Sequence, residues 1–282
     1  MVNTSEVTER RKSLRSVVVG GQRVDLLQRD ELVGAVSGAL IGTRAPLLLA
    51  SANLDHVYRF EPEADLFATT HAGQWLVLLD GMPLVWACRR ATGRAWDQLA
   101  GSDILPDLLS RAEALGATVG FLGGPDSLRE PLAATLQERW PDLRVTGHWT
   151  PPREVIEDDD ASALLADVIR DAGTDLLVVG LGKPRQEQWM ARHGARTGAK
   201  VAAAFGAAAE FVAGTQKRSP HVMSRMGFEW LYRLAREPRR LARRYLAEGP
   251  VALARVVRGV TIPNVAPRVL APVSHTPDRV AA

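Results

Sequence analysis

The stretch from Leu76 to Trp86, LVLLDGMPLVW, joins an apolar run, an Asp-Gly turn and a second apolar stretch at helical spacing. This order predicts a strand, a tight turn and a helix, with Asp80 at the carboxyl end of the strand. Ligands of open parallel sheets bind at that edge. A carboxylate placed there can act as a general base. Capping of the following helix is the alternative role for Asp80, and for this stretch taken alone it is the simpler one.

The same alternation continues along the chain. Short apolar runs that alternate with helical patterns are typical of parallel strands joined by right-handed crossovers. The runs are apolar almost throughout, as expected for strands that are buried on both faces. We therefore predict an α/β fold with a doubly wound, mostly parallel sheet, Rossmann-like in class. The expected strands are 46–52, 75–79, 118–122, 144–148, 175–180 and 200–205, and the expected helices are 28–41, 56–70, 102–115, 127–140, 161–172 and 186–196.

The pattern predicts four regions. Residues 1–15 read as a mobile N-terminal tail, and residues 16–220 as the α/β domain, which opens with a hairpin around Gly20-Gly21. Residues 221–260 are basic and helical, with no strand between the segments, and are expected to lie near a membrane. Four prolines mark residues 261–282 as a disordered tail. Removal of residues 221–282 is expected to leave a soluble core.

Composition narrows the class of protein. The chain has 282 residues, of which 46% are hydrophobic, so a full core is expected. The net charge is only +3, and Cys88 is the single cysteine, which excludes an intramolecular disulfide and a cysteine-based metal site. The N-terminus is polar, and no run approaches the ~18 apolar residues that span a bilayer. These features favour a cytoplasmic protein that is soluble or peripheral to a membrane.

Several expected strands end in polar or glycine-rich turns. Asn53 can donate and accept hydrogen bonds to a sugar, although an Asx turn or a helix cap explains it equally well. Gly123-Gly124 would let a phosphate approach main-chain N–H groups, although a plain turn is the commoner reason for such a pair. The stretch 180–187, GLGKPRQE, places Gly182 and Gln186 at a helix N-terminus, where anions are favoured. Together these turns predict a site for a phosphorylated, sugar-like ligand at one edge of the sheet.

The sequence contains no motif that clearly predicts a metal site. Asp158-Asp159-Asp160 contains the D-x-D spacing that can bind a metal–diphosphate. The run precedes a helix rather than following a strand, so a role at the helix N-terminus is favoured. No histidine motif for zinc and no G-x-S-x-G motif for a serine nucleophile is present.

Several stretches taken together resemble the WecG/TagA/CpsF family of bacterial glycosyltransferases. The matches occur in the family's order and cover roughly residues 15–247. They are Ser51-Ala52-Asn53, Leu79-Asp80-Gly81-Met82-Pro83, Gly101-Ser102-Asp103, Phe121-Leu122-Gly123-Gly124, Val179 to Glu187, Arg218-Ser219-Pro220 and Glu229-Trp230-Leu231-Tyr232-Arg233.

The resemblance implies an inverting transferase without a metal or other cofactor. It would move a sugar, of the N-acetylmannosamine type or a related hexose or uronic acid, from a UDP-sugar to a saccharide on a lipid diphosphate. The product would serve cell-surface polysaccharide synthesis, at the inner face of the cell membrane. Asp80 matches the proposed catalytic base, Asn53 and Gln186 match substrate-contacting positions, and Arg233, Arg240 and Arg243 match arginines expected to approach the diphosphate. With Gly123, Gly124, Gly182 and Glu187 of the strand-end turns, these residues make up the expected substrate-binding set.

The resemblance also suggests the partners. These are the donor, the lipid-linked acceptor and an anionic membrane surface, with no nucleic acid and with a homo-oligomer left open. The chain departs from the family pattern at Gln98, where arginine is common, and Arg94 could supply the missing guanidinium.

Two other functions remain open from the sequence. One is a nucleotide-dependent oxidoreductase on a Rossmann-like sheet, although the glycine-rich dinucleotide fingerprint is missing after the first strand. The other is a non-catalytic basic adaptor for a membrane or nucleic acid, which would leave Asp80 and the strand-end turns without a role.

Overall fold

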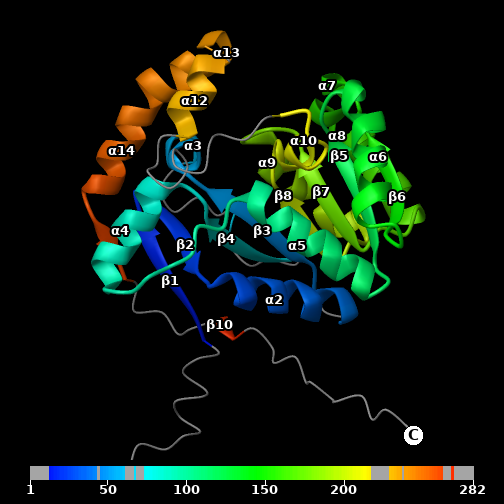
Figure 1. Cartoon of the computed structure of the whole chain (residues 1–282), viewed down its shortest axis with the longest axis horizontal. Coiled ribbons are helices and arrows are strands. Elements are labelled where there is room, and N and C mark those ends of the chain that lie inside the picture. The colour runs from blue at the N-terminus through cyan, green and yellow to red at the C-terminus, as the bar shows by residue number, and fades with distance from the viewer. Residues whose placement is uncertain are drawn as a thin grey trace, which may run out of the picture.

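The computed structural model describes residues 13–42, 45–60, 67, 73–216, 229–236, 238–262 and 268–269. A single sheet crosses the molecule and carries helices on both faces (Figure 1). Its strand order is β10-β1-β2-β4-β3-β8-β7-β5-β6, and β9 pairs with β1 outside this path. The predicted α/β class with a doubly wound, mostly parallel sheet is confirmed.

Seven neighbouring strands of this sheet are parallel, from β2 to β6. The six predicted strands are all present, each within one residue of its expected bounds. The parallel strands are β2 (Gln22–Leu26), β4 (Gln74–Leu79), β3 (Leu47–Ala52), β8 (Val201–Ala204), β7 (Leu176–Gly180), β5 (Thr118–Gly123) and β6 (Arg144–Trp149).

The strand β1 (Ser13–Val19) runs antiparallel to β2. The turn between them holds Gly20 and Gly21 at positive φ, 59° and 81°, which confirms the predicted hairpin. The short strands β9 (Val260–Thr261) and β10 (Arg268–Val269) also pair antiparallel with β1. The region expected to be a disordered tail therefore includes strand residues, and residues 263–267 and 270–282 lie outside the described residues.

Two layers of helices explain why the strands are apolar throughout. Along β3, Leu47 and Leu49 pack into one core cluster, while Leu48 and Ala50 pack into the cluster on the other face. One layer contains α2 (Arg29–Ile41), α5 (Gly101–Ala114), α6 (Arg129–Arg139) and α10 (Ala208–Val212), and the other contains α3 (Leu54–Arg59), α4 (Met82–Thr92), α8 (Asp159–Asp171), α9 (Arg185–His193) and α14 (Gly249–Val257). Short connecting helices are η2 (Asp126–Leu128), α7 (Arg153–Glu157) and η3 (Gly194–Thr197).

The helix α3 differs from its predicted bounds of 56–70. It begins at Leu54, because Asn53 caps it, and it ends at Arg59, because Phe60 is extended with φ −101° and ψ 133°. Of the remaining predicted residues only Phe67 is described, and it lies in a single turn. The predicted long helix is therefore wrong, and α3 is a short helix next to the sheet edge.

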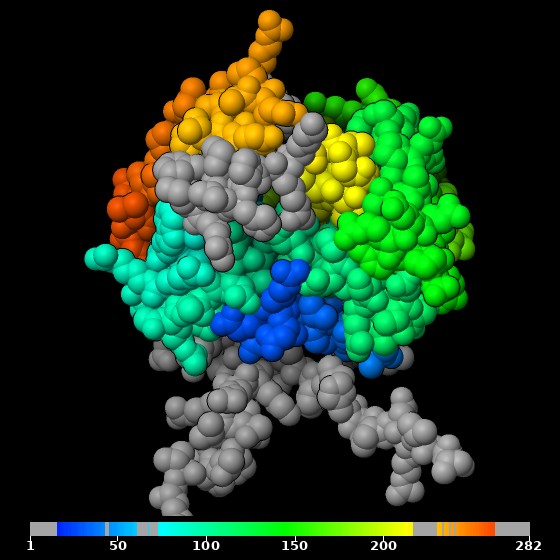
Figure 2. Space-filling view, in the orientation of Figure 1, coloured from blue at the N-terminus to red at the C-terminus, as the bar shows by residue number. Residues whose placement is uncertain are grey.

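The C-terminal helices are α12 (Glu229–Arg236), α13 (Pro238–Ala242), the π-helical segment η4 (Arg243–Glu248) and α14. Figure 1 shows them along the side of the molecule that carries α3 and α4. Figure 2 shows the orange-red α14 against the cyan α4. Ala252 and Val256 of α14 are buried in the core cluster, so α14 belongs to the core of the fold. None of the described helices is both long and apolar enough to cross a bilayer.

Candidate functional site

Asn53 and Asp80 lie side by side at the carboxyl edge of the sheet. The strands β3 and β4 end in register, with Ala52 opposite Leu79, so the residues that follow are neighbours. The side-chain amide of Asn53 donates to Oδ2 of Asp80 at 3.0 Å. The main-chain N–H groups of Asp80 and Gly81 both donate to the carbonyl of Ala52, at 3.0 and 3.1 Å. The turn after β4 is thereby fixed to the end of β3.

Gly81 permits this close approach. A Cβ atom at position 81 would lie 3.0 Å from Cβ of Asn53 and 3.1 Å from its Cα, tighter than almost all real contacts. Gly81 is also the N-cap residue of α4, without a side-chain bond to the helix. Asp80 is therefore not the capping residue of α4, and its half-buried carboxylate is held by Asn53.

Asn53 serves two purposes. Its Oδ1 accepts from the N–H of His56 at 3.2 Å and caps α3, while its Nδ2 donates to Asp80. The helix cap, one of the two alternatives that the sequence left open, is therefore present, whereas the contact with a sugar stays a prediction. Because both ends of the amide are used, the Asn53 side chain has one orientation.

The glycine turns after β5 and β7 touch each other and line a small hollow. Gly123 and Gly124 have φ of 96° and 80°, and a Cβ on Gly123 would lie 2.6 Å from the carbonyl oxygen of Gly180. The N–H of Gly124 donates to that carbonyl at 3.3 Å. The hollow is also lined by Gly206 and Glu210. The glycines therefore allow the two turns to approach closely at the edge of the sheet.

The side chains of Gln186 and Glu187 lie beneath the turn that follows β7. Gln186 is 1% exposed; its Oε1 accepts from the N–H of Gly182, and its Nε2 donates to the carbonyl of Ala204. Nε2 also donates to Oε1 of Glu187, which is 0% exposed. Both side chains therefore support the turn from below, and the predicted direct contacts with substrate stay predictions. Gly182 itself is exposed, with φ of 77°.

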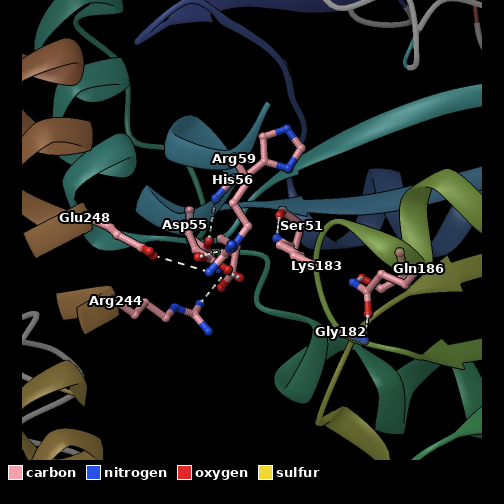
Figure 3. A network of polar contacts seen from close by, with 12 residues as sticks. Ser51, Asp55, His56, Arg59, Gly182, Lys183, Gln186, Arg244 and Glu248 are labelled. Carbon is pink, nitrogen blue, oxygen red and sulfur yellow. Dashed lines mark hydrogen bonds and ion pairs between the residues drawn. The ribbon is translucent and has the colours of Figure 1, made fainter. Parts of the chain in front are cut away.

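Lys183 joins this turn to the end of β3. Its ammonium donates to the carbonyl of Ser51, two residues before Asn53 (Figure 3). Burial raises the pKa of Glu187, and the charge of Lys183 opposes that rise. Burial together with Lys183 holds the pKa of His56 well below its usual value, so this imidazole is neutral near pH 7. The contact of Lys183 with β3 joins residues 132 positions apart, so the local pattern of the stretch 180–187 does not reveal it.

The C-terminal arginines are only partly described. Arg233 lies in α12 and Arg240 in α13, and the placement of their side chains lies outside the described residues. Arg243 begins η4; its side chain is 85% exposed, and its Nε lies 3.1 Å from Oε1 of Glu248. Arg94, considered as a replacement for the guanidinium missing at Gln98, lies over the ring of Trp96 at 5.7 Å.

The D-x-D run is a helix start. Asp158 accepts from the N–H of Ala161 at 2.7 Å and caps α8, and Asp159 and Asp160 lie in its first turn. The preferred sequence interpretation is thus confirmed. Within the residues that the structure describes, no group of three histidine, cysteine or acidic side chains is arranged to hold a metal ion.

Fold and edge together define an α/β protein whose polar pair and glycine turns meet at the carboxyl ends of parallel strands, the edge at which open sheets of this class bind ligands. The model of the glycosyl transferase WecG/TagA/CpsF family matches residues 17–264, and the chain belongs to that family. It is a glycosyltransferase, as the resemblance implied, and this counts against the oxidoreductase and adaptor alternatives.

Relatives from Staphylococcus aureus strains MRSA252 and MW2 are both named N-acetylglucosaminyldiphosphoundecaprenol N-acetyl-beta-D-mannosaminyltransferase. Each is 26% identical to this chain over 189 residues, which are 64% of this chain and 72% of the relative.

Proposed function

We propose that this chain transfers an N-acetylmannosamine-type sugar, or a related hexose or uronic acid, from a UDP-sugar to a lipid-diphosphate-linked saccharide. The observation that carries the proposal is the Asp80 carboxylate held by Asn53 at the sheet edge, in a member of a glycosyltransferase family. The names of the Staphylococcus aureus relatives support the acceptor class and the sugar.

The proposed reaction is a single displacement. The acceptor hydroxyl oxygen attacks the anomeric carbon, the bond from that carbon to the UDP oxygen breaks, and UDP leaves with the electron pair. Asp80 takes the hydroxyl proton, which makes the attacking oxygen more nucleophilic. Attack opposite the leaving group inverts the anomeric configuration. Asn53 keeps the carboxylate in place, since its amide is fixed at both ends.

Positive charge at the same edge suits the donor diphosphate. Lys183 is fixed on the Ser51 carbonyl, and the glycines at Gly123-Gly124 and Gly182 leave the neighbouring turns without side chains that would keep a ligand away from the main chain. We propose that these features, with the C-terminal arginines, balance the charge of the leaving group without a metal or other cofactor. Activity that disappears with EDTA and returns with Mg²⁺ or Mn²⁺ would overturn this part of the proposal.

A panel of UDP-sugars tests the donor. Purified protein is incubated with each donor and a short lipid diphosphate that carries N-acetylglucosamine, and products are detected by mass spectrometry. We expect one N-acetylhexosamine to be added from UDP-N-acetylmannosamine, and little product from UDP-glucose. Transfer from neither this donor nor any related UDP-hexose or uronic acid would refute the proposed function.

We also propose that the chain works in the cytoplasm, peripheral to the inner face of the membrane. The C-terminal helices expose apolar side chains, including Leu231, Leu246 and Val257 at 46, 62 and 76%, and they also expose arginines such as Arg236 and Arg239. Such a surface suits an anionic bilayer. We expect co-sedimentation with anionic liposomes that weakens at high salt, because salt screens the charges. Equal sedimentation with neutral liposomes would contradict the role of charge.

A further inference from the structure

The short helix α3 connects the proposed base to the C-terminal helices. Asn53, which holds Asp80, is the N-cap of this helix, whose six residues are Leu54–Arg59. A helix of that length is not stable by itself, so its position depends on what it packs against. Whatever holds α3 therefore also sets the place of the Asn53 amide.

An ion-pair network holds one side of α3 against η4 (Figure 3). The Asp55 carboxylate, whose side chain is only 5% exposed, binds Nε of Arg59 at 2.8 Å and lies 3.3 Å from Nη2 of Arg244. Arg59 also reaches Oε2 of Glu248 at 3.3 Å. The Glu248 side chain is 8% exposed, and its Oε1 forms an ion pair with Nε of Arg243 at 3.1 Å. Two nearly buried carboxylates are thus each bound by two guanidinium groups.

A further contact joins the end of α3 to α14. Nη1 of Arg255 donates to the main-chain carbonyl of Val57 at 3.0 Å. Val57 lies in the last turn of α3, where carbonyls lack partners within the helix. The C-terminal segment therefore contacts α3 at two points. Arg244 pairs with the Asp55 side chain, and Arg255 donates to the main-chain carbonyl of Val57.

Resting on the proposed function, we propose that Asp55 and Arg244 are positioning residues for sugar transfer. Their ion pair docks the C-terminal helices on α3 and thereby fixes Asn53, which holds the Asp80 carboxylate. The C-terminal segment then positions the catalytic base through α3 and Asn53, in addition to any contact it makes with a lipid-linked acceptor. Removal of Arg244 leaves the Asp55 charge with one guanidinium in a nearly buried place, which loosens the start of α3.

The test compares two matched arginine variants of the full-length protein. Arg244→Gln removes one of the two guanidiniums on Asp55. Arg196→Gln removes one of the two on Asp167, whose other partner is Arg170, on the surface of α8. Hydrogen exchange is followed at the amides of His56 and Val57, which bond to Oδ1 and O of Asn53. In parallel, kcat and KM for the UDP-sugar are measured.

For Arg244→Gln we expect exchange at these two amides about tenfold faster than in wild type, because local opening becomes easier. We expect kcat to fall about tenfold with an unchanged donor KM, because the base is misplaced while the donor site stays intact. Arg196→Gln should change neither quantity. Arg244→Lys should recover most of both quantities. The loss in the double variant Asp55→Asn, Arg244→Gln should be smaller than the two single losses combined, since the two groups interact.

Unchanged exchange in Arg244→Gln would overturn the proposal. A fall in kcat with unchanged exchange would also overturn it, because Arg244 would then act on the substrate rather than through α3. If Arg244→Gln does not fold, Asp55→Asn carries the same measurements, with Arg244→Lys as the variant that keeps the charge. Absence of transfer by the wild-type protein would count against the proposed function, whereas the exchange measurement needs no substrate and decides the docking of α3 separately.

Discussion

The two hydrogen bonds of the Asn53 side chain can be separated by substitution. Asn53→Asp keeps an oxygen that can cap α3 but removes the donor to Asp80 and places a second carboxylate beside it. We expect stability close to wild type and a large loss of transfer at pH 7. The acidic limb of the kcat/KM profile should move to higher pH, because neighbouring like charges raise a carboxyl pKa.

The control for that experiment is Asn53→Ala, which loses both bonds. Loss of the cap should lower the free energy of unfolding by about 1 kcal/mol. Urea denaturation and a pH profile of transfer measure the two effects. Wild-type transfer by Asn53→Asp at pH 7 would show that the bond to Asp80 has no catalytic role.

Glu187 gives a prediction for stability against pH. Burial raises the pKa of this carboxyl in the folded protein above its unfolded value, so the folded state binds the proton more tightly. The ionised form is therefore destabilising above the folded pKa, and this effect disappears below the unfolded pKa. Glu187→Gln should be more stable than wild type near pH 7, and the difference should shrink as the pH falls through the raised folded pKa and disappear below about 4.5, the unfolded value. Urea denaturation at several pH values checks this, and a difference that grows on acidification would contradict the sign.

At the residue scale, the sequence located the Asn53–Asp80 pair because each residue follows directly on an apolar run. Strand ends in one parallel sheet meet at one edge, so local pattern is sufficient. The sequence did not indicate that Gln186 and Glu187 are buried, because the groups that Gln186 bonds to belong to β8 and to the turn after β7. Burial of a polar side chain depends on partners that periodicity does not reveal.

At the element scale, α14 offers two adjacent valines in contrasting surroundings. Val256 is 3% exposed and packs in the core, whereas Val257 is 76% exposed. Val256→Ala should lower the free energy of unfolding by about 2 kcal/mol, because buried methyl groups are lost. Val257→Ala should change it by less than about 0.5 kcal/mol. Thermal denaturation of both variants measures the difference, and equal stabilities would mean that α14 is not packed as described.

The same packing corrects the expectation that removal of residues 221–282 leaves a soluble core. Such a truncation would uncover the core side chains that contact Ala252 and Val256 and would leave Asp55 with Arg59 alone. The sequence suggested a separate basic segment because arginines are frequent there and strands are not. The apolar face that joins α14 to the core is too short to stand out in that pattern.

Elements buried on both faces were predictable, and short capped ones were not. The strand β3 is fully buried, which makes its sequence continuously apolar. In contrast, α3 has only six residues, and its start is set by the Asn53 cap rather than by apolar spacing. Its true bounds therefore required the structure.

At the scale of the whole molecule, the contacts between α3 and the C-terminal helices could not be predicted from the sequence. Arg59 and Glu248 are 189 residues apart, and Arg244 is equally distant from Asp55. These pairs bring the C-terminal helices to the edge that carries Asp80. The proposed site therefore combines the turn at Asp80, the short helix α3 and the C-terminal helices.

The most direct measurement compares transfer by the wild-type protein and by Asp80→Asn, with UDP-N-acetylmannosamine and a lipid-diphosphate-linked N-acetylglucosamine acceptor. The product is followed by mass spectrometry, and UDP binding by calorimetry shows that the variant is folded. We expect product of inverted anomeric configuration from wild type, and transfer slower by about 10²–10⁴-fold in Asp80→Asn with UDP binding intact. Transfer by a folded Asp80→Asn protein at the wild-type rate would contradict the role of Asp80 as the base.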